Sequence, residues 1–236
     1  MNTLSRALNL LFVLCLITLS YGQESVEEAA ILARELVDFS EDAIGTMATV
    51  YPEDHDYLSG QPFSLQEYYA SCHENGSLTL LFMPISRHSQ NIIHHRSHSA
   101  SISISSSPPS ANKARVSLIG NVTIFDDINA TPDREEVEKC YVATHKDAKW
   151  WLPGPREPHV AYWARFDPHS VYYVGGFGSE HYIGYIPLEL YQSASSLELY
   201  DCEEIVGDEV MDDNADEDDE HTRTIGIGGR LLVQES

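Results

Sequence analysis

The chain has 236 residues, a length that fits one domain with additional segments at its ends. It carries 37 Asp and Glu against 14 Lys and Arg, a formal net charge of −23, so nucleic-acid backbones and anionic membrane surfaces repel it. Hydrophobic residues make up 42% of the chain and aromatic residues 10%, which excludes a wholly disordered protein.

The first 22 residues have the pattern of a cleaved secretory signal. One cation, Arg6, precedes the apolar run 7–19, and the small residues Ser20 and Gly22 stand at positions −3 and −1 of a cleavage site. A membrane anchor is the alternative, but about thirteen apolar residues span only ~20 Å as a helix, short of a ~30 Å hydrocarbon core. We therefore expect no membrane span after cleavage.

The body of the chain begins with a helix and a strand. Ser25 and Glu28 have the spacing of a capping box, and apolar residues then recur at helical spacing, which predicts a helix over residues 25–38. Residues 44–51 are typical of a strand, and the polar stretch 52–64 indicates a long surface loop.

Three further strands are predicted in the middle of the body. Residues 78–85 are apolar at successive positions, which predicts a central strand covered on both faces. Residues 100–104 and 114–124 alternate between apolar and polar, so each strand has one buried and one wet face. This alternation directs Asn121 outward, and the link 107–112 joins the two strands.

A second helix and further strands complete the body. Proline and acidic residues in the first turn predict a helix over residues 131–145. Residues 159–166 and 171–176 are expected to form a hairpin turned at 167–170, followed by a strand at 182–186. This order predicts an antiparallel barrel with helices outside it, and the lack of βαβ crossovers between parallel strands and of glycine-rich phosphate loops argues against nucleotide-binding folds.

Cysteines and sequons fit an exported protein. Cys72, Cys140 and Cys202 remain after the expected cleavage, so at most one internal disulfide forms, and their spacing leaves the pair open. No Cys-x-x-Cys motif points to thiol-redox chemistry or a structural zinc site. Three Asn-x-Ser/Thr sequons predict glycosylation of a secreted chain, at Asn75, Asn121 and Asn129.

The C-terminal residues 201–236 are predicted to be an acidic, disordered tail after a domain over residues 23–200. Twelve acids and no base lie within residues 201–220, and like charges at this density repel one another and keep a chain extended. A calcium site is the alternative, but the spacing lacks the glycine and terminal glutamate of an EF-hand loop.

Four segments of the body, in this order, resemble the CREG family of secreted glycoproteins. They are AIGTMAT at 43–49, PISRHSQN at 84–91, ARVSLIG at 114–120 and YVGGFG at 173–178. The resemblance covers about residues 25–195. It implies a mainly β (α+β) fold, the FMN-binding split barrel of the pyridoxamine phosphate oxidases, which is an antiparallel Greek-key barrel with flanking helices. It also implies a homodimer, and family members are exported or endolysosomal proteins that are not known to retain the flavin enzymes' activity.

The same resemblance marks a candidate FMN site. In the related oxidases, FMN lies at the dimer interface, and basic and hydroxyl side chains near the end of a central strand and on a neighbouring strand hold its phosphate. The matching residues by position are Ser86, Arg87, His88 and Asn91, with Lys113 and Arg115 as additions. Arg115 alternates onto the wet face of its strand, so it is also explained as a surface charge, and the Ser-Pro-Pro insertion is an alternative occupant of the site.

Four histidines lie within eleven residues, namely His88, His94, His95 and His98. Imidazoles bind zinc, copper or haem iron and titrate near pH 6.5. The cluster therefore indicates a haem or metal site, a pH-responsive interface, or only solvated and hydrogen-bonded residues. His145 is expected to pack against its aromatic neighbours rather than act as a catalytic base.

The sequence holds no nucleophile motif, and the glycines at 175, 176 and 178 are typical of a strand end rather than a phosphate loop. We predict a secreted or endolysosomal glycoprotein dimer that binds or regulates an unnamed protein partner, without its own chemistry and without a cofactor. The alternatives are an FMN-dependent oxidoreductase of the same fold and a haem or metal binder that uses the histidines from His88 to His98.

Overall fold

The computed structural model describes residues 23–154 and 160–194, and the backbone of residues 224–227 and 230–233. By their internal contacts, the residues fall into two units, Met1–Tyr200 and Asp201–Ser236. The elements of the first unit are α2 (Val26–Asp38), β1 (Ile44–Val50), β2 (Pro62–Tyr68), β3 (Leu78–Phe82), α3 (Arg87–His94), β4 (Ser99–Ser105), β5 (Arg115–Phe125), α4 (Arg134–Thr144), β6 (Tyr162–Val174), β7 (Ile183–Ile186) and α5 (Leu188–Ser193).

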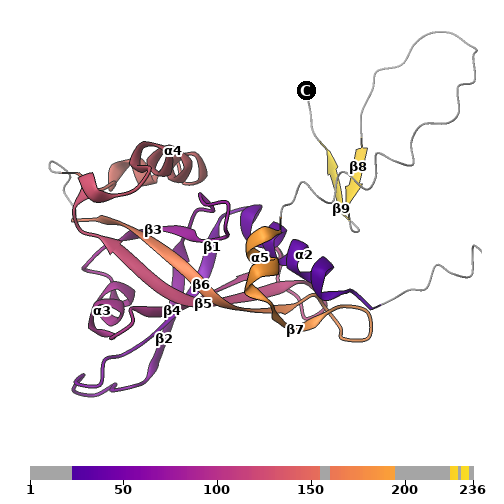
Figure 1. Cartoon of the computed structure of the whole chain (residues 1–236), viewed down its shortest axis with the longest axis horizontal. Helices are drawn as coiled ribbons and strands as arrows, with labels where there is room; N and C mark the ends of the chain where they lie inside the picture. Colours follow the sequence, from indigo (N-terminus) through magenta and orange to yellow (C-terminus); the bar gives the residue numbers. More distant parts are fainter. Residues whose placement is uncertain (1–22, 155–159, 195–223, 228–229, 234–236) are drawn as a thin grey trace, which may run out of the picture. The chain divides into compact units, whose positions relative to one another are not determined.

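Seven strands of this unit form one antiparallel sheet (Figure 1). Their order is β2-β1-β4-β5-β6-β3, and β7 also pairs with β6. An isolated bridge between Ala70 and Thr79 joins the segment after β2 to β3, so the two ends of the strand order meet. The fold is an open split barrel, which confirms the predicted antiparallel barrel with flanking helices.

Helix α2 begins as the sequence predicts. Ser25 Oγ accepts the N–H of Glu28 at 3.1 Å, and the Glu28 carboxylate accepts the N–H of Ser25 at 2.8 Å, so both bonds of the capping box are present. The helix buries small residues such as Ala29 and Ala33 in the main core, beside α5 and β7 (Figure 1).

Strands β4 and β5 show the predicted alternation. Ile102 and Ile104 on β4, and Val116 and Leu118 on β5, are buried in the main core, while the polar residues between them are partly or fully exposed. Asn121 is exposed, as expected.

Strand β3 is covered on both faces, as predicted, but it is not a central strand. Among the described strands it pairs with β6, and it lies at the end of the strand order. Leu80 and Phe82 are buried in the main core, whereas Leu81 packs against a second cluster of buried residues that includes Tyr141 and Trp163. Because Tyr141 belongs to α4, that helix covers the second face of β3.

The predicted hairpin of residues 159–166 and 171–176 is wrong. Residues 162–174 form one continuous strand, β6, which pairs with β5 along its length. The register shifts at Gly120, which pairs with Pro168, and His169 has no partner across the ladder, so the Asp-Pro-His-Ser segment is a β-bulge. Gly120 permits this close approach, because a Cβ there would overlap the backbone carbonyl of Asp167.

Two predicted boundaries also differ from the structure. The expected loop 52–64 ends at Gln61, because β2 begins at Pro62 and pairs with β1. Helix α4 begins at Arg134 rather than at residue 131, because a short 3₁₀ turn precedes it and Asp133 has a left-handed backbone with φ of 49°.

Cys72 and Cys140 form a disulfide, which ties α4 to the segment before β3. The predicted signal at 1–22, the acidic block at 201–220 and Cys202 lie outside the described residues. In the second unit, β8 (Thr224–Ile227) and β9 (Arg230–Val233) form an antiparallel pair. No helix among the described residues has both the length and the apolar character to cross a bilayer.

Candidate functional site

The predicted phosphate-binding residues from Ser86 to Asn91 lie at and within α3, which packs against β1 (Figure 1). Ser86 caps this helix, since its Oγ accepts the N–H of Ser89 at 3.1 Å and donates to Ser89 Oγ at 2.8 Å. Its hydroxyl is therefore used within the helix cap. Arg87 is exposed, and its guanidinium carbon lies 5.4 Å from the centre of the Tyr51 ring. Arg87 thus remains accessible to an anion.

His88 and Asn91 are instead buried between α3 and β1, with 4% and 1% of their surfaces exposed. Asn91 Nδ2 donates to Thr49 Oγ1 at 3.0 Å, and the same hydroxyl lies 3.2 Å from His88 Nδ1. The Thr49 hydroxyl thus contacts both side chains, as the acceptor for Asn91 Nδ2 and as the hydrogen-bond partner of His88 Nδ1. Burial also lowers the pKa of His88, so its ring is neutral near pH 7. The three side chains form a buried neutral network rather than an anion site.

Lys113 and Arg115 lie far from α3 within one chain. Ala48 on β1 pairs with Ser101 on β4, whereas Arg115 pairs with Ser105 and Lys113 precedes it. At about 3.3 Å per strand residue, Lys113 is about 20 Å along the sheet from the α3 end. The guanidinium of Arg115 donates to the carbonyls of Ala111 and Lys113, so it stabilises the loop between β4 and β5.

The positions of these side chains show whether they can bind the phosphate of FMN together. A phosphate site needs several donors that converge on one point. Of the five residues from Ser86 to Lys113 that the resemblance marks, Ser86 is used in a cap, His88 and Asn91 are buried with Thr49, and Lys113 lies at the opposite end of the sheet. Only Arg87 faces outward at α3 among these five, so they do not form a phosphate cradle within one chain.

The four clustered histidines do not converge either. His94 Nδ1 lies 2.7 Å from the Gln90 carbonyl, and His98 Nδ1 lies 3.2 Å from the Val122 carbonyl. His95 Nδ1 accepts backbone N–H groups after the helix, while His88 is buried behind α3. Within the described residues, no group of three or more His, Cys, Asp or Glu side chains is placed to hold a metal ion. The cluster therefore gives no support to the metal alternative.

His145 has the packing role that the sequence predicts. Its Nε2 lies 2.8 Å from the Tyr69 carbonyl, and its ring stacks on Tyr68 with centroids 4.2 Å apart. Only 5% of His145 is exposed, so its ring is not accessible to a substrate.

The fold agrees with a match to a known sequence family. The profile described as "CREG, beta-barrel" matches residues 24–193, which include all seven strands of the first unit and helices α2 to α5. The chain belongs to the CREG β-barrel family. No match was found among curated protein sequences.

Solved structures of low sequence identity are similar to this CREG barrel, and the first of the following three shares its fold. The heme binding protein from Mycobacterium smegmatis is 21% identical with a TM-score of 0.55, over 74% of this chain and 63% of that chain. HutZ, the heme storage protein from Vibrio cholerae, is 18% identical with a TM-score of 0.42, over 60% and 92%. An F420 reductase is 15% identical with a TM-score of 0.41, over 59% and 94%. At such identities the likeness concerns the fold alone.

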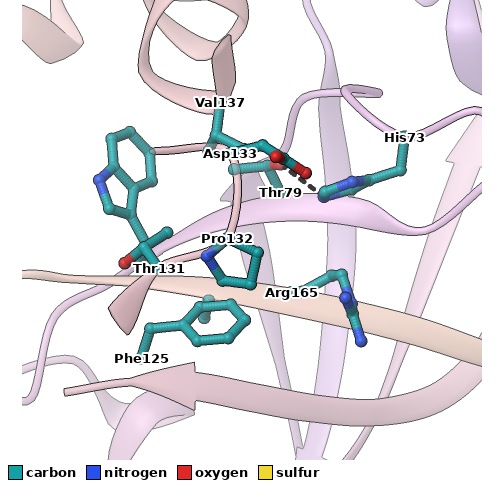
Figure 2. Close-up of a pocket in the computed structure, with 10 residues that line it drawn as sticks. His73, Thr79, Phe125, Thr131, Pro132, Asp133, Val137 and Arg165 are labelled. Atoms are coloured by element: carbon teal, nitrogen blue, oxygen red, sulfur yellow. Dashed lines mark hydrogen bonds between the residues drawn. The ribbon is translucent and has the colours of Figure 1, made fainter. Parts of the chain in front are cut away.

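The CREG barrel also contains a cavity that the sequence analysis missed. It measures about 60 Å³ and lies where α4 begins, beside β3 and β6 (Figure 2). Its polar lining comes from His73, Thr79, Thr131, Asp133 and from two residues of β6, Trp163 and Arg165. These residues are scattered over almost one hundred positions of the chain and share no motif, so only the tertiary structure brings them together.

Proposed function

We propose that this CREG barrel is a secreted or endolysosomal glycoprotein that acts as a homodimeric binding or regulatory protein and catalyses no reaction. One observation carries the proposal: three of the four candidate phosphate ligands near α3 are used in bonds within the chain. Ser86 caps the helix, and His88 and Asn91 share the buried hydroxyl of Thr49. A flavin enzyme of this fold needs those donors on the surface.

The disulfide and the sequons support the choice of compartment. Disulfides such as Cys72–Cys140 persist in oxidising compartments and are rare in the cytosol. Asn75, Asn121 and Asn129 are all exposed, so each asparagine is sterically open to a glycan.

The first experiment titrates the purified, glycosylated chain with FMN and follows flavin fluorescence together with the mass in solution. We expect a dimer and no saturable binding at micromolar FMN. Arg87→Ala is the informative variant, because this side chain is exposed at the start of α3, and Arg96→Ala, which removes another exposed arginine, is its matched control. Micromolar binding that is lost in the first variant and kept in the second overturns the proposal and supports the FMN-dependent oxidoreductase.

A second experiment tests export and glycosylation. The full chain is expressed in a secreting eukaryotic host, and the medium is examined before and after glycosidase treatment. We expect the chain in the medium and a loss of apparent mass on deglycosylation, reduced stepwise in Asn75→Gln, Asn121→Gln and Asn129→Gln. A chain that stays in the cytosol with an unmodified mass contradicts this part of the proposal.

A haem-binding role is the other alternative, because a structural neighbour is a heme binding protein and His94 is exposed at the end of α3. Adding haem to the same preparation and recording its visible spectrum tests it. A Soret band that disappears in the double variant His94→Ala, His98→Ala favours haem binding over the proposal made above.

A further inference from the structure

Strand β2 has one free edge. It pairs with β1 through all seven of its residues, without a bulge, and no other described strand pairs with it. Figure 1 shows β2 at the rim of the sheet. Soluble proteins usually protect such edges with lysine, proline, a bulge or a covering segment. Apart from Pro62 at its first position, β2 contains no lysine, proline or bulge, and Leu65 near its middle is 61% exposed.

The register of the ladder gives the direction of the backbone groups along this edge. Just beyond β2, the N–H of Tyr69 donates to the Ala43 carbonyl at 3.0 Å. In an antiparallel pair, residues that bond to the partner strand alternate with residues whose N–H and C=O point away from it. Counted back from Tyr69, the N–H and C=O groups of Ser64 and Gln66 therefore point away from β1, and both residues are exposed.

These outward groups are free to bind another strand. Neither the N–H of Ser64 nor that of Gln66 has a hydrogen-bond partner among the described residues. The free edge ends at Tyr68, whose N–H donates to the Glu67 carboxylate at 3.3 Å. Strand addition to an exposed sheet edge is a recurrent mode of peptide recognition, in which main-chain hydrogen bonds supply affinity and side chains supply specificity.

Carboxylates lie at both ends of this edge. Three exposed acids lie within residues 53–56, in the loop that leads from β1 into β2. At the other end, the Tyr68 hydroxyl donates to Asp147 Oδ2 at 3.3 Å, and the charges of Asp147 and Asp42 raise the pKa of Tyr68. A strand that lies along β2 therefore meets negative charge at each of its ends.

A positively charged partner suits this edge better than a second copy of the chain. Residues 35–86 contain no Lys or Arg, and the loop acids outnumber Arg87, which lies against the Tyr51 ring. In an antiparallel pair of two β2 strands, the acidic loop of each copy would lie next to the carboxylates near Tyr68 of the other. Like charges so placed repel each other, whereas cations at both ends of an added strand are attracted.

We propose that the free edge of β2 binds an extended segment of a partner protein, with Lys or Arg at both of its ends and an uncharged, β-prone middle. Its main chain pairs with Ser64 and Gln66, its cations lie near the two groups of carboxylates, and an apolar side chain packs on Leu65. The inference rests on the proposed function in that it names the kind of partner for that binding protein. Its test depends on neither export nor flavin, so a failure here is distinguishable from a failure of the proposed function.

Three fluorescent peptides test the proposal on the full chain by anisotropy. Each has seven residues, the length of β2, and alternates threonine and valine between two end residues. The first peptide ends in lysines, the second ends in glutamates, and the third ends in lysines but is N-methylated at the amides that pair with β2. We expect saturable binding of the first, weakened by salt, and at least about tenfold weaker binding of the other two.

Amide hydrogen exchange, measured by NMR, locates the peptide. At saturation with the first peptide, the N–H groups of Ser64 and Gln66 are expected to exchange at least about tenfold more slowly, and those of β7 at an unchanged rate. Leu65→Lys adds a like charge at the edge and is expected to weaken binding at least about tenfold. Ile183→Lys, the same change at an exposed position of β7, is the matched control and is expected to bind normally.

A second variant keeps the test informative if Leu65→Lys does not fold. Gln66→Pro removes one outward N–H, leaves the bonds to β1, and is expected to weaken binding at least about fivefold. Equal binding of the three peptides, no saturable binding, or full binding by both β2 variants would overturn the proposal. Slow exchange of Ser64 and Gln66 before any peptide is added would also overturn it, because a second copy or another segment would then cover the edge.

Discussion

Removing the disulfide between Cys72 and Cys140 is expected to lower the stability of the barrel by about 4 kcal/mol. The bridge closes a loop across a sequence separation of 68 residues. For a loop of that length, the chain-entropy relation gives about 15 cal/mol/K of lost freedom in the unfolded state, which is about 4 kcal/mol at 25 °C. In a domain of this size, such a loss lowers Tm by about 8–16 °C.

Urea unfolding of the double variant Cys72→Ser, Cys140→Ser, followed by circular dichroism, measures this loss. The wild type is measured with and without reductant beside it, which separates the cross-link from the burial of the two half-buried side chains. The variant and the reduced wild type are expected to agree within about 1 kcal/mol. A reduced wild type that keeps the full stability of the oxidised protein would refute the reasoning, because the cross-link would then contribute nothing.

Three further perturbations test the core, the buried network and a titrating group. Gly120→Ala is expected to cost about 2–3 kcal/mol in urea unfolding, because the new Cβ overlaps the Asp167 carbonyl at the bulge; a loss under 0.5 kcal/mol contradicts the bulge geometry. Thr49→Val leaves the buried side chains of His88 and Asn91 without their shared partner, so it is expected to lower the free energy of unfolding by about 1–3 kcal/mol. The control Thr46→Val, at an exposed position on the same strand, is expected to change it little. Burial raises the pKa of Glu67 from 4.5 to about 7. Between these two pH values the folded state keeps a proton on Glu67 that the unfolded state has released, so the free energy of unfolding is expected to fall as pH rises from about 4.5 to 7. Glu67→Gln should flatten this part of the stability–pH curve, and an unchanged slope would exclude Glu67 as its source.

The sequence predicts best those elements whose side chains alternate or repeat against one core. The capping box of Ser25 and Glu28 and the alternation along β4 and β5 are local patterns, and each appears in the structure where it is expected. The two segments that the sequence misses, β2 and the continuous β6, lack such a signal. The side chains of β2 are mostly exposed, and the Asp-Pro-His-Ser segment of β6 has the composition of a turn, although Gly120 on another strand accommodates it as a bulge.

The surroundings of the candidate site residues could be predicted only in part. The resemblance places Ser86, His88 and Asn91 near the end of a strand, and the structure has them at and within α3, which follows β3. Which of them face the surface depends on Thr49, a residue on β1 whose hydroxyl holds two of them inside the barrel. Likewise, Trp163 and Thr131 read as ordinary strand and loop residues, and only the packing of α4 shows that both are buried without partners.

The pairing of β6 with three other strands also determines when the barrel can form during synthesis. Phe82 on β3 pairs with Tyr162, eighty residues later in the chain. At about 5–20 residues per second, ribosomes need roughly 4–16 s to make that interval, during which the apolar β3 and one edge of β5 have no partner. All three sequons precede β6, so a chain that enters the secretory lumen N-terminus first presents every acceptor asparagine before the barrel can close. The half-synthesised barrel, with its exposed strand edges, is therefore the species most prone to aggregate, and it is the stage at which chaperones have most to protect.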